Sequence, residues 1–181
     1  MKKINRILAM LLILAMVLSL GITAMAAEAT LTGSITLNDA PNVSVSGKTF
    51  NAYKVLNATF VDGSNPEGGV AYTVPAEMAD WYAARYGLTK TDADFGEQVA
   101  KKIAEVEKDD MFTFAAAVLA AAKNAYGQHP TGTVTAGDGV NSVTINNLPF
   151  GYYVVEDVGA AAPISALMLD TVGGVSTSST T

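Results

Sequence analysis

The sequence predicts a mainly β fold of the α+β class, a β-sandwich that carries a helical insertion between its strands. Two features of the 181-residue chain lead to this expectation. Short segments rich in Thr, Val and Ile, many with alternating apolar and polar residues, lie before residue 75 and after residue 130, and this pattern is typical of strands. Between them, the residues from about 75 to 126 place apolar side chains at helical spacing.

The first half of the domain contains three predicted strands, at residues 31–37, 48–60 and 70–74. Turn-forming and loop-forming residues separate them, and Pro75 ends the third. In the second strand the alternation shifts near Tyr53 and Lys54, so the sequence leaves its register open.

The helical insertion contains three predicted helices, at residues 75–86, 94–108 and 111–125. Pro75 stands at the start of the first helix and Gly87 follows its end. Asp94 is expected to cap the second helix, and Asp109 or Asp110 the third. The third helix is rich in Ala and apolar on nearly all sides, so we expect it to be substantially buried.

After Pro130 the strand pattern returns. Strands are predicted at residues 131–135, 142–145, 152–156 and 166–172. Residues 173–181 are rich in Gly, Ser and Thr, and we interpret them as a flexible tail or the start of a linker.

The first 26 residues have the pattern of a secretory signal peptide. Three basic residues precede an apolar run at 7–22, and small residues follow it, so cleavage is expected between Ala26 and Ala27. The apolar run is shorter than a membrane span requires. We therefore expect an exported protein, with a domain at residues 27–172 that does not associate with a membrane after cleavage.

The composition excludes several classes of function. The chain has no cysteine, a single histidine and a net charge of −6. It therefore offers no thiol nucleophile, no Cys-ligated zinc site and no basic surface for nucleic acid. The histidine, His129, lies among turn residues, and no known catalytic motif is present. We expect no enzymatic activity, no metal and no cofactor.

Two sequence blocks carry a resemblance to a known family. The first combines residues 33–37 with Gly-Lys-Thr-Phe-Asn-Ala-Tyr-Lys-Val-Leu at 47–56, and the second is the run at 143–156 that contains Leu-Pro-Phe-Gly-Tyr-Tyr-Val-Val-Glu. Together they resemble the N-terminal domain of Gram-positive backbone pilins and related SpaA-like, Cna protein B-type surface proteins, over most of residues 30–172.

The resemblance implies an immunoglobulin-like or prealbumin-like β-sandwich at the cell surface or cell wall of a Gram-positive bacterium. It implies a structural subunit of a pilus or cell-surface adhesin, with no catalytic turnover. The implied partners are neighbouring pilin subunits and sortase, where the full-length protein carries the necessary motifs.

Members of this family often contain an internal Lys–Asn or Lys–Asp isopeptide bond, formed with the help of a nearby carboxyl group. Glu156 falls at the position of the family's catalytic glutamate, within Tyr-x-Val-x-Glu. The family's lysine follows the first strand, where this chain has none. The candidates are therefore Lys48 or Lys54 as the amine, and a residue such as Asn146 or Asn147 as the amide.

Two alternatives stay open at this point. The chain contains neither a Tyr-Pro-Lys string nor a sortase sorting signal, so it is either a piece of a longer pilin or a secreted relative that is not polymerised in the usual way. The alternative function is a secreted module that binds a host protein or glycan. Its contacts would come from the helical insertion, with Trp81 and Tyr82, or from the loop at 62–69.

Overall fold

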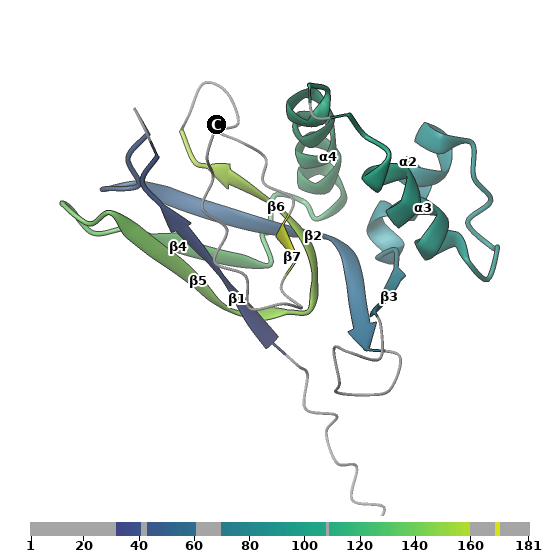
Figure 1. The fold of residues 1–181 in the computed structure, drawn as a ribbon, viewed down its shortest axis with the longest axis horizontal. Helices are drawn as coiled ribbons and strands as arrows, with labels where there is room; N and C mark the ends of the chain where they lie inside the picture. Colours follow the sequence, from purple (N-terminus) through teal and green to yellow (C-terminus); the bar gives the residue numbers. More distant parts are fainter. Residues whose placement is uncertain (1–31, 41–42, 61–69, 108, 160–168, 171–181) are drawn as a thin grey trace, which may run out of the picture. The chain divides into compact units, whose positions relative to one another are not determined.

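The fold is mixed α+β, with antiparallel strands and three helices, in a computed structural model that describes residues 32–40, 43–60, 70–107, 109–159 and 169–170. The predicted signal peptide, its cleavage site and the tail at 173–181 lie outside the described residues. In chain order the elements are β1 (Thr32–Asn38), β2 (Thr49–Phe60), β3 (Val70–Thr73), α2 (Ala76–Tyr86), α3 (Phe95–Ala104), α4 (Met111–Ala125), β4 (Gly132–Thr135), β5 (Ser142–Pro149), β6 (Gly151–Asp157) and β7 (Leu169–Asp170) (Figure 1).

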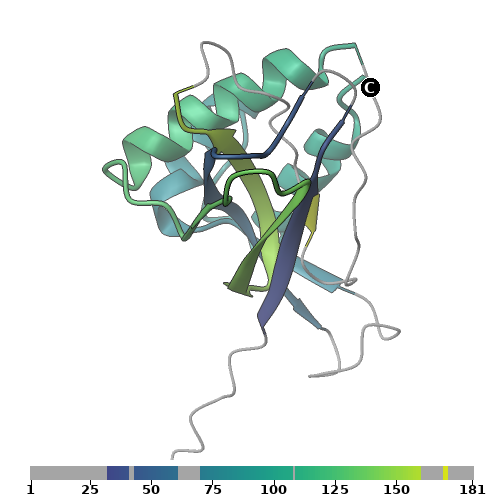
Figure 2. The ribbon, with the colours of Figure 1, turned by 90° about the vertical axis from the view of Figure 1, so that its left-hand side faces the viewer.

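The strands form two antiparallel sheets. β1 pairs with β5 in a two-stranded sheet. In the larger sheet β2 pairs with β6 along one edge, and with β4 and then β3 along the other, while β7 pairs with β6. Figure 2 shows β1 and β5 running beside each other, with α4 above the strands. The long β2 strand is therefore the centre of the larger sheet.

Each face of β2 contributes to a different hydrophobic core. Phe50 and Ala52 pack with apolar residues of β1, β5 and β6, including Ile35 and Ile145. Tyr53 and the residues that follow pack against the three helices. A register shift between Lys54 and Leu56 opposite β6 lets Val55 and Leu56 share the helix-facing core. This irregularity explains why the alternation in the sequence changes near Tyr53.

The first and third helices lie close to their predicted positions. α2 follows Pro75 and ends at Gly87, which adopts the left-handed conformation that a glycine tolerates best. α4 has the predicted bounds, and one side of it is buried against the sheet and α2. The expectation that this helix is substantially buried is confirmed by five buried residues, although Phe112 in its first turn is 52% exposed.

The second helix is shorter than predicted, and the predicted caps do not form as expected. α3 ends at Ala104 rather than at residue 108, because the acidic run that follows offers only Val106 for burial and acids are unfavourable at a helix C-terminus. Asp94 and Asp110 occupy the N-cap positions, but neither side chain caps its helix. The Asp94 carboxylate instead accepts a hydrogen bond from the Gln98 amide.

The strands after the insertion differ from prediction mainly in length. β5 continues to Pro149 rather than ending at residue 145. In this added part, Leu148 and Pro149 pair with Gly33 and Thr32 of β1, beyond the point where the register between the two strands shifts. Within the described ranges, none of the three helices has the length and hydrophobicity needed to cross a membrane.

Candidate functional site

Three polar side chains form a row across the middle of the larger sheet. Asn51 of β2 pairs directly with Thr133 of β4 on one side and with Glu156 of β6 on the other. Alternate residues of a strand share a face, and Tyr53 and Val154, two positions away from Asn51 and Glu156, belong to the helix-facing core. The row therefore lies on the face of the sheet that the helices cover.

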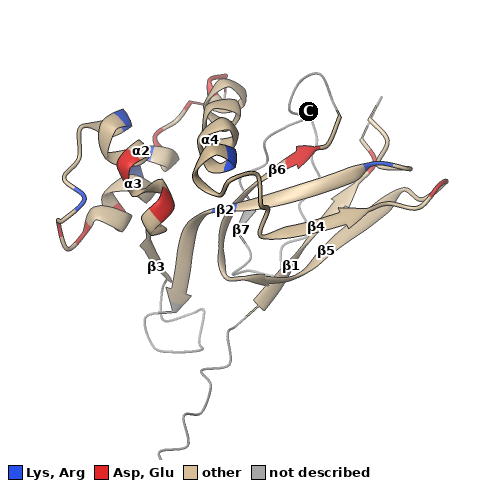
Figure 3. Ribbon diagram, turned by 180° about the vertical axis from the view of Figure 1, so that it is seen from behind, with Lys and Arg blue, Asp and Glu red and all other residues tan. Residues whose placement is uncertain are grey.

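A lysine from the helical insertion completes this cluster. Lys123 lies in the last turn of α4, and its Nζ donates a hydrogen bond of 2.8 Å to Oε2 of Glu156. The other oxygen of the same carboxylate, Oε1, accepts a hydrogen bond of 3.3 Å from Nδ2 of Asn51. Figure 3 shows the acidic end of β6 in red and the basic position on α4 in blue. Glu156 thus bridges an amine and a carboxamide.

Burial makes this carboxylate different from an ordinary strand-end glutamate. Glu156 is only 8% exposed as a residue, whereas the Lys123 side chain keeps 32% of its surface exposed. The hydrogen bond to Glu156 raises the pKa of Lys123, against the smaller opposing effect of burial. Burial, and next the charge of Glu156, raises the pKa of the neighbouring Tyr53 hydroxyl. Lys123 and Glu156 therefore form a salt bridge at hydrogen-bond distance.

The oxygen of the Asn51 side chain also has a partner. The hydroxyl of Thr133 donates a hydrogen bond of 2.8 Å to Oδ1 of Asn51. Both ends of the carboxamide are therefore held, the nitrogen by Glu156 and the oxygen by Thr133.

Of the lysines that the sequence singled out, Lys48 pairs with a different acid. Its Nζ lies 2.8 Å from Oδ2 of Asp157, whose side chain is 5% exposed. Consecutive residues of a strand point to opposite faces, so Glu156 and Asp157 engage lysines on the two faces of the sheet.

Lys54 lies in the irregular part of β2, with its side chain packed against β6. Its Cδ atom is 3.0 Å from where a Cβ would stand on Gly151, so the lysine stem uses the space that this glycine leaves open. Burial lowers the pKa of Lys54, and the nearby charge of Glu77 acts in the opposite direction.

The asparagines that the sequence singled out lie in the smaller sheet. Asn146 and Asn147 are exposed residues of β5, and they lie where the register with β1 shifts, between the Ile35–Ile145 and Gly33–Leu148 pairs. Asn147 has φ of 58°, a backbone conformation that asparagine adopts more readily than most residues. Both asparagines therefore belong to the irregular part of the pairing between β1 and β5.

The structure therefore brings Glu156 together with Lys123 and Asn51, a lysine and an asparagine that sequence reasoning did not select. Asn51 lies within the block Gly-Lys-Thr-Phe-Asn-Ala-Tyr-Lys, on the same strand face as Tyr53. Because Asn51 and Tyr53 are two positions apart on one strand, the sequence could have indicated that their side chains share a face. Nothing in the sequence shows that the last turn of α4 reaches the end of β6.

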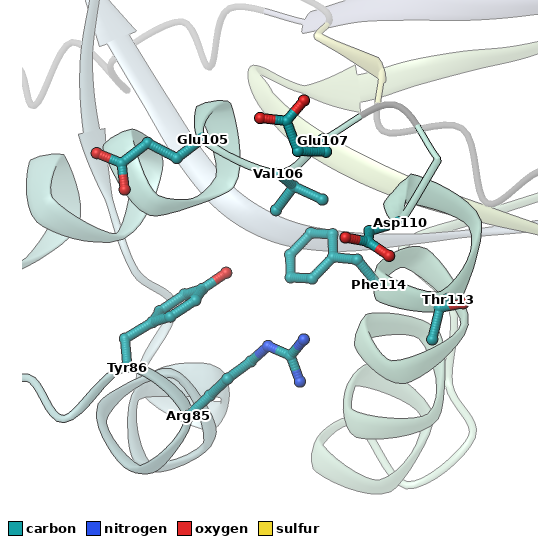
Figure 4. A pocket seen from close by; sticks show the side chains of 8 residues that line it. All are labelled: Arg85, Tyr86, Glu105, Val106, Glu107, Asp110, Thr113 and Phe114. Atoms are coloured by element: carbon teal, nitrogen blue, oxygen red, sulfur yellow. The ribbon is translucent and has the colours of Figure 1, made fainter.

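A second feature is a pocket of about 340 Å³ between α2, the segment after α3, and α4. Figure 4 shows the Arg85 guanidinium and the Tyr86 hydroxyl turned toward the ring of Phe114, while the Glu105 carboxylate points away. The Arg85 Cζ atom lies 5.2 to 5.9 Å from the ring centres of Trp81, Tyr86 and Phe114. The cation–π contact with Phe114 joins α2 to α4, whereas those with Trp81 and Tyr86 lie within α2.

The aromatic residues proposed from the sequence for ligand contact differ in accessibility. Tyr82 is completely buried, and its ring packs edge-on against Trp81 at 4.9 Å. Tyr82 therefore belongs to the core, and Arg85 and Tyr86 are the residues of this helix that line the pocket.

Among the described residues, no group of three or more His, Cys, Asp or Glu side chains has the arrangement of a metal site. Neither a protein-family model nor a curated protein matches the chain.

Proposed function

We propose that this chain is a structural subunit of a Gram-positive pilus or cell-surface adhesin, exported through its signal peptide and without catalytic turnover. Its partners are neighbouring subunits, with sortase as the assembling enzyme where the full-length protein carries the motifs that sortase needs. The proposal rests on the two sequence blocks that resemble backbone pilins and on one structural observation, the bridging position of Glu156.

That observation supports an internal crosslink between Lys123 and Asn51. Glu156 accepts hydrogen bonds from the Lys123 amine and the Asn51 carboxamide at the same time. Transfer of a proton from Nζ to Oε2 would leave a neutral amine next to a protonated carboxyl group, which is the combination that amide exchange requires. The transfer works against the raised pKa of Lys123, so the neutral amine is the minor form, and the crosslink would form through it.

The reaction is balanced without any other reactant. The Lys123 Nζ attacks Cγ of Asn51 and forms the new C–N bond. The bond between Cγ and Nδ2 breaks, and the nitrogen leaves with protons relayed by Glu156. The products are a secondary amide between the two side chains and one ammonium ion, and Glu156 returns to its ionised form.

A crosslink at this place would suit a protein that bears load. The exported chain has no cysteine and so lacks the usual covalent brace of secreted domains. Lys123 belongs to the helical insertion and Asn51 to the central strand of the larger sheet. A bond between them would fasten the insertion to the sheet and close a long loop of chain, which restricts the unfolded state.

The proposal includes a finer description of the fold, an immunoglobulin-like or prealbumin-like β-sandwich. Its support is that residues of the β1–β5 sheet, such as Ile35 and Ile145, share one hydrophobic core with Phe50 and Val155 of the larger sheet. Two sheets that bury their facing side chains together are the basic arrangement of a sandwich.

The assembly state in native cells tests this function. An antibody raised against residues 27–181 would be used to blot cell-wall and medium fractions after boiling in SDS. We expect a ladder of very large species in the wall fraction, because sortase-built fibres are covalent. A single band near the mass of the mature chain, found only in the medium, would overturn the proposal.

The second candidate function is a secreted binding module for a host protein or glycan, and the pocket beside Arg85 is the observation that favours it. Its volume of about 340 Å³ is at the small end for ligand pockets. The test is saturable binding of the mature chain to panels of host extracellular proteins and glycans. Binding that is abolished by Arg85→Ala would support this candidate, and an absence of saturable binding would remove it.

A further inference from the structure

The orientation of the Asn51 carboxamide follows from the chemistry of its two partners. An ionised carboxylate can only accept hydrogen bonds, so the side that faces Oε1 of Glu156 must be the NH₂ group. The oxygen Oδ1 must then face Thr133. Since a carbonyl oxygen can only accept, the Thr133 hydroxyl must be the donor in the 2.8 Å contact.

This orientation matches what amide exchange at Asn51 would need. The leaving nitrogen points at the group that can supply its proton, and the carbonyl oxygen points at a hydrogen-bond donor. When Nζ of Lys123 attacks Cγ, negative charge develops on Oδ1, and a donor already aimed at that oxygen stabilises it. The pairing of β4 with β2 holds this donor in place, because Thr133 lies directly opposite Asn51.

We propose that the Thr133 hydroxyl is a catalytic group of the crosslink, which stabilises the charge on Asn51 Oδ1 and keeps the leaving nitrogen toward Glu156. The inference rests on the Lys123–Asn51 crosslink proposed above. It adds a residue outside the Lys–Asn–Glu set, on a strand that sequence reasoning did not connect with the reaction.

Three variants separate this role from a structural one. Thr133→Val removes the hydroxyl with little change of shape, and Thr133→Ser keeps it. Thr135→Val is the matched control. Thr135 is on the same strand, and its hydroxyl is hydrogen-bonded at 2.9 Å to the hydroxyl of Thr49 on β2, away from Asn51.

The measurement is the rate of ammonia loss after folding. The mature chain, residues 27–181, is recovered unfolded from inclusion bodies so that no crosslink has formed, and its intact mass is followed after refolding. Circular dichroism and urea unfolding, measured for each variant, verify that it has folded.

We expect Thr133→Val to slow the loss of ammonia by about tenfold to a hundredfold. This is below the effect of removing a fully buried oxyanion donor, because the hydrogen bond between Thr133 and Asn51 is exposed. Thr133→Ser and Thr135→Val should react at nearly the wild-type rate.

The outcomes distinguish this inference from the function it rests on. If the folded wild type and folded Thr133→Val lose ammonia at the same rate, the proposed role of Thr133 is overturned and the crosslink stands. An equal slowing in Thr135→Val would also overturn it, because the effect would then belong to the strand pairing. A folded wild-type chain that keeps its full mass overturns the crosslink itself.

Discussion

The amine of Lys123, in the last turn of α4, lies 2.8 Å from a carboxylate oxygen of Glu156 near the end of β6. This ion pair joins the helical insertion to the central part of the larger sheet. Because Glu156 is almost completely buried, it would lose its compensating charge if the lysine were removed.

Replacing Lys123 should weaken the fold more than the loss of an ordinary surface lysine. Lys123→Met leaves Glu156 without its partner and prevents the crosslink, which would close the chain between residues 51 and 123. Loop-closure entropy for a loop of this size is worth about 4 kcal/mol, and urea unfolding of the mature chain measures the loss.

The control for this experiment is Lys102→Met, because Lys102 forms an ion pair with Glu105 in which both side chains are about half exposed. Exposed pairs contribute little to the free energy of unfolding, because water and salt screen them. Equal effects of the two substitutions would contradict a special role for Lys123.

The ion pair has a pH dependence that can be measured without the crosslink. In an Asn51→Ala background no crosslink can form, so Lys123 remains a titratable amine. Its pKa is raised in the folded state from an ordinary value of 10.5. Its contribution to stability is therefore fully present below pH 10.5 and is lost as the pH rises through the higher folded-state pKa.

Two chains are compared across this range, Asn51→Ala and Asn51→Ala combined with Lys123→Met. The comparison subtracts the titration of the tyrosines that Lys123 does not influence, whereas Tyr53, whose pKa the Lys123 charge lowers, contributes to the difference. The difference in their free energies of unfolding should shrink above pH 10.5. A difference that stays constant through that range would show that the pair does not stabilise the fold as described.

Lys54 should behave in the opposite way to Lys123. Burial lowers its pKa, so folding disfavours the charged form and the lysine costs stability at neutral pH. We expect Lys54→Met to leave stability unchanged or to raise it slightly, because solvent screens the charge of this partly exposed amine, as measured by urea unfolding. A loss of more than about 1 kcal/mol would show that the amine has a stabilising partner.

Gly96 should be intolerant of any side chain. It is the second residue of α3, and a Cβ there would collide with the carbonyl oxygen of Tyr72 and lie 2.6 Å from Cα of Thr73. Gly96→Ala should lower the melting temperature and cost about 2 kcal/mol. In Gly137→Ala the new atom would meet only Val140, at 3.9 Å. A Gly96→Ala chain as stable as this control would contradict the packing of α3 against β3.

Local pattern was enough to predict most of the elements. The positions of α2 and α4 followed from Pro75, Gly87 and the Ala-rich run, and the shift of alternation near Tyr53 marked a real irregularity in β2. Glu156 was found because it lies in a recognisable strand motif.

The partners of Glu156 could not be found in the same way. Asn51 becomes its neighbour through the register between β2 and β6, and Thr133 joins them through a second register with β4. Such pairings join residues far apart in the chain and are set by the tertiary fold. Lys123 was missed because the resemblance to a known family pointed to lysines on strands, whereas Lys123 lies on a helix.

The intact mass of residues 27–181, folded and then denatured, tests the central claim most directly. The account predicts that the wild-type mass is lower than the sequence mass by one ammonia, and that Lys48→Met and Lys54→Met show the same loss. Lys123→Met and Asn51→Ala should show the full mass of their sequences. A wild-type chain at its full sequence mass, or a loss of ammonia that survives Lys123→Met, would contradict the proposed crosslink.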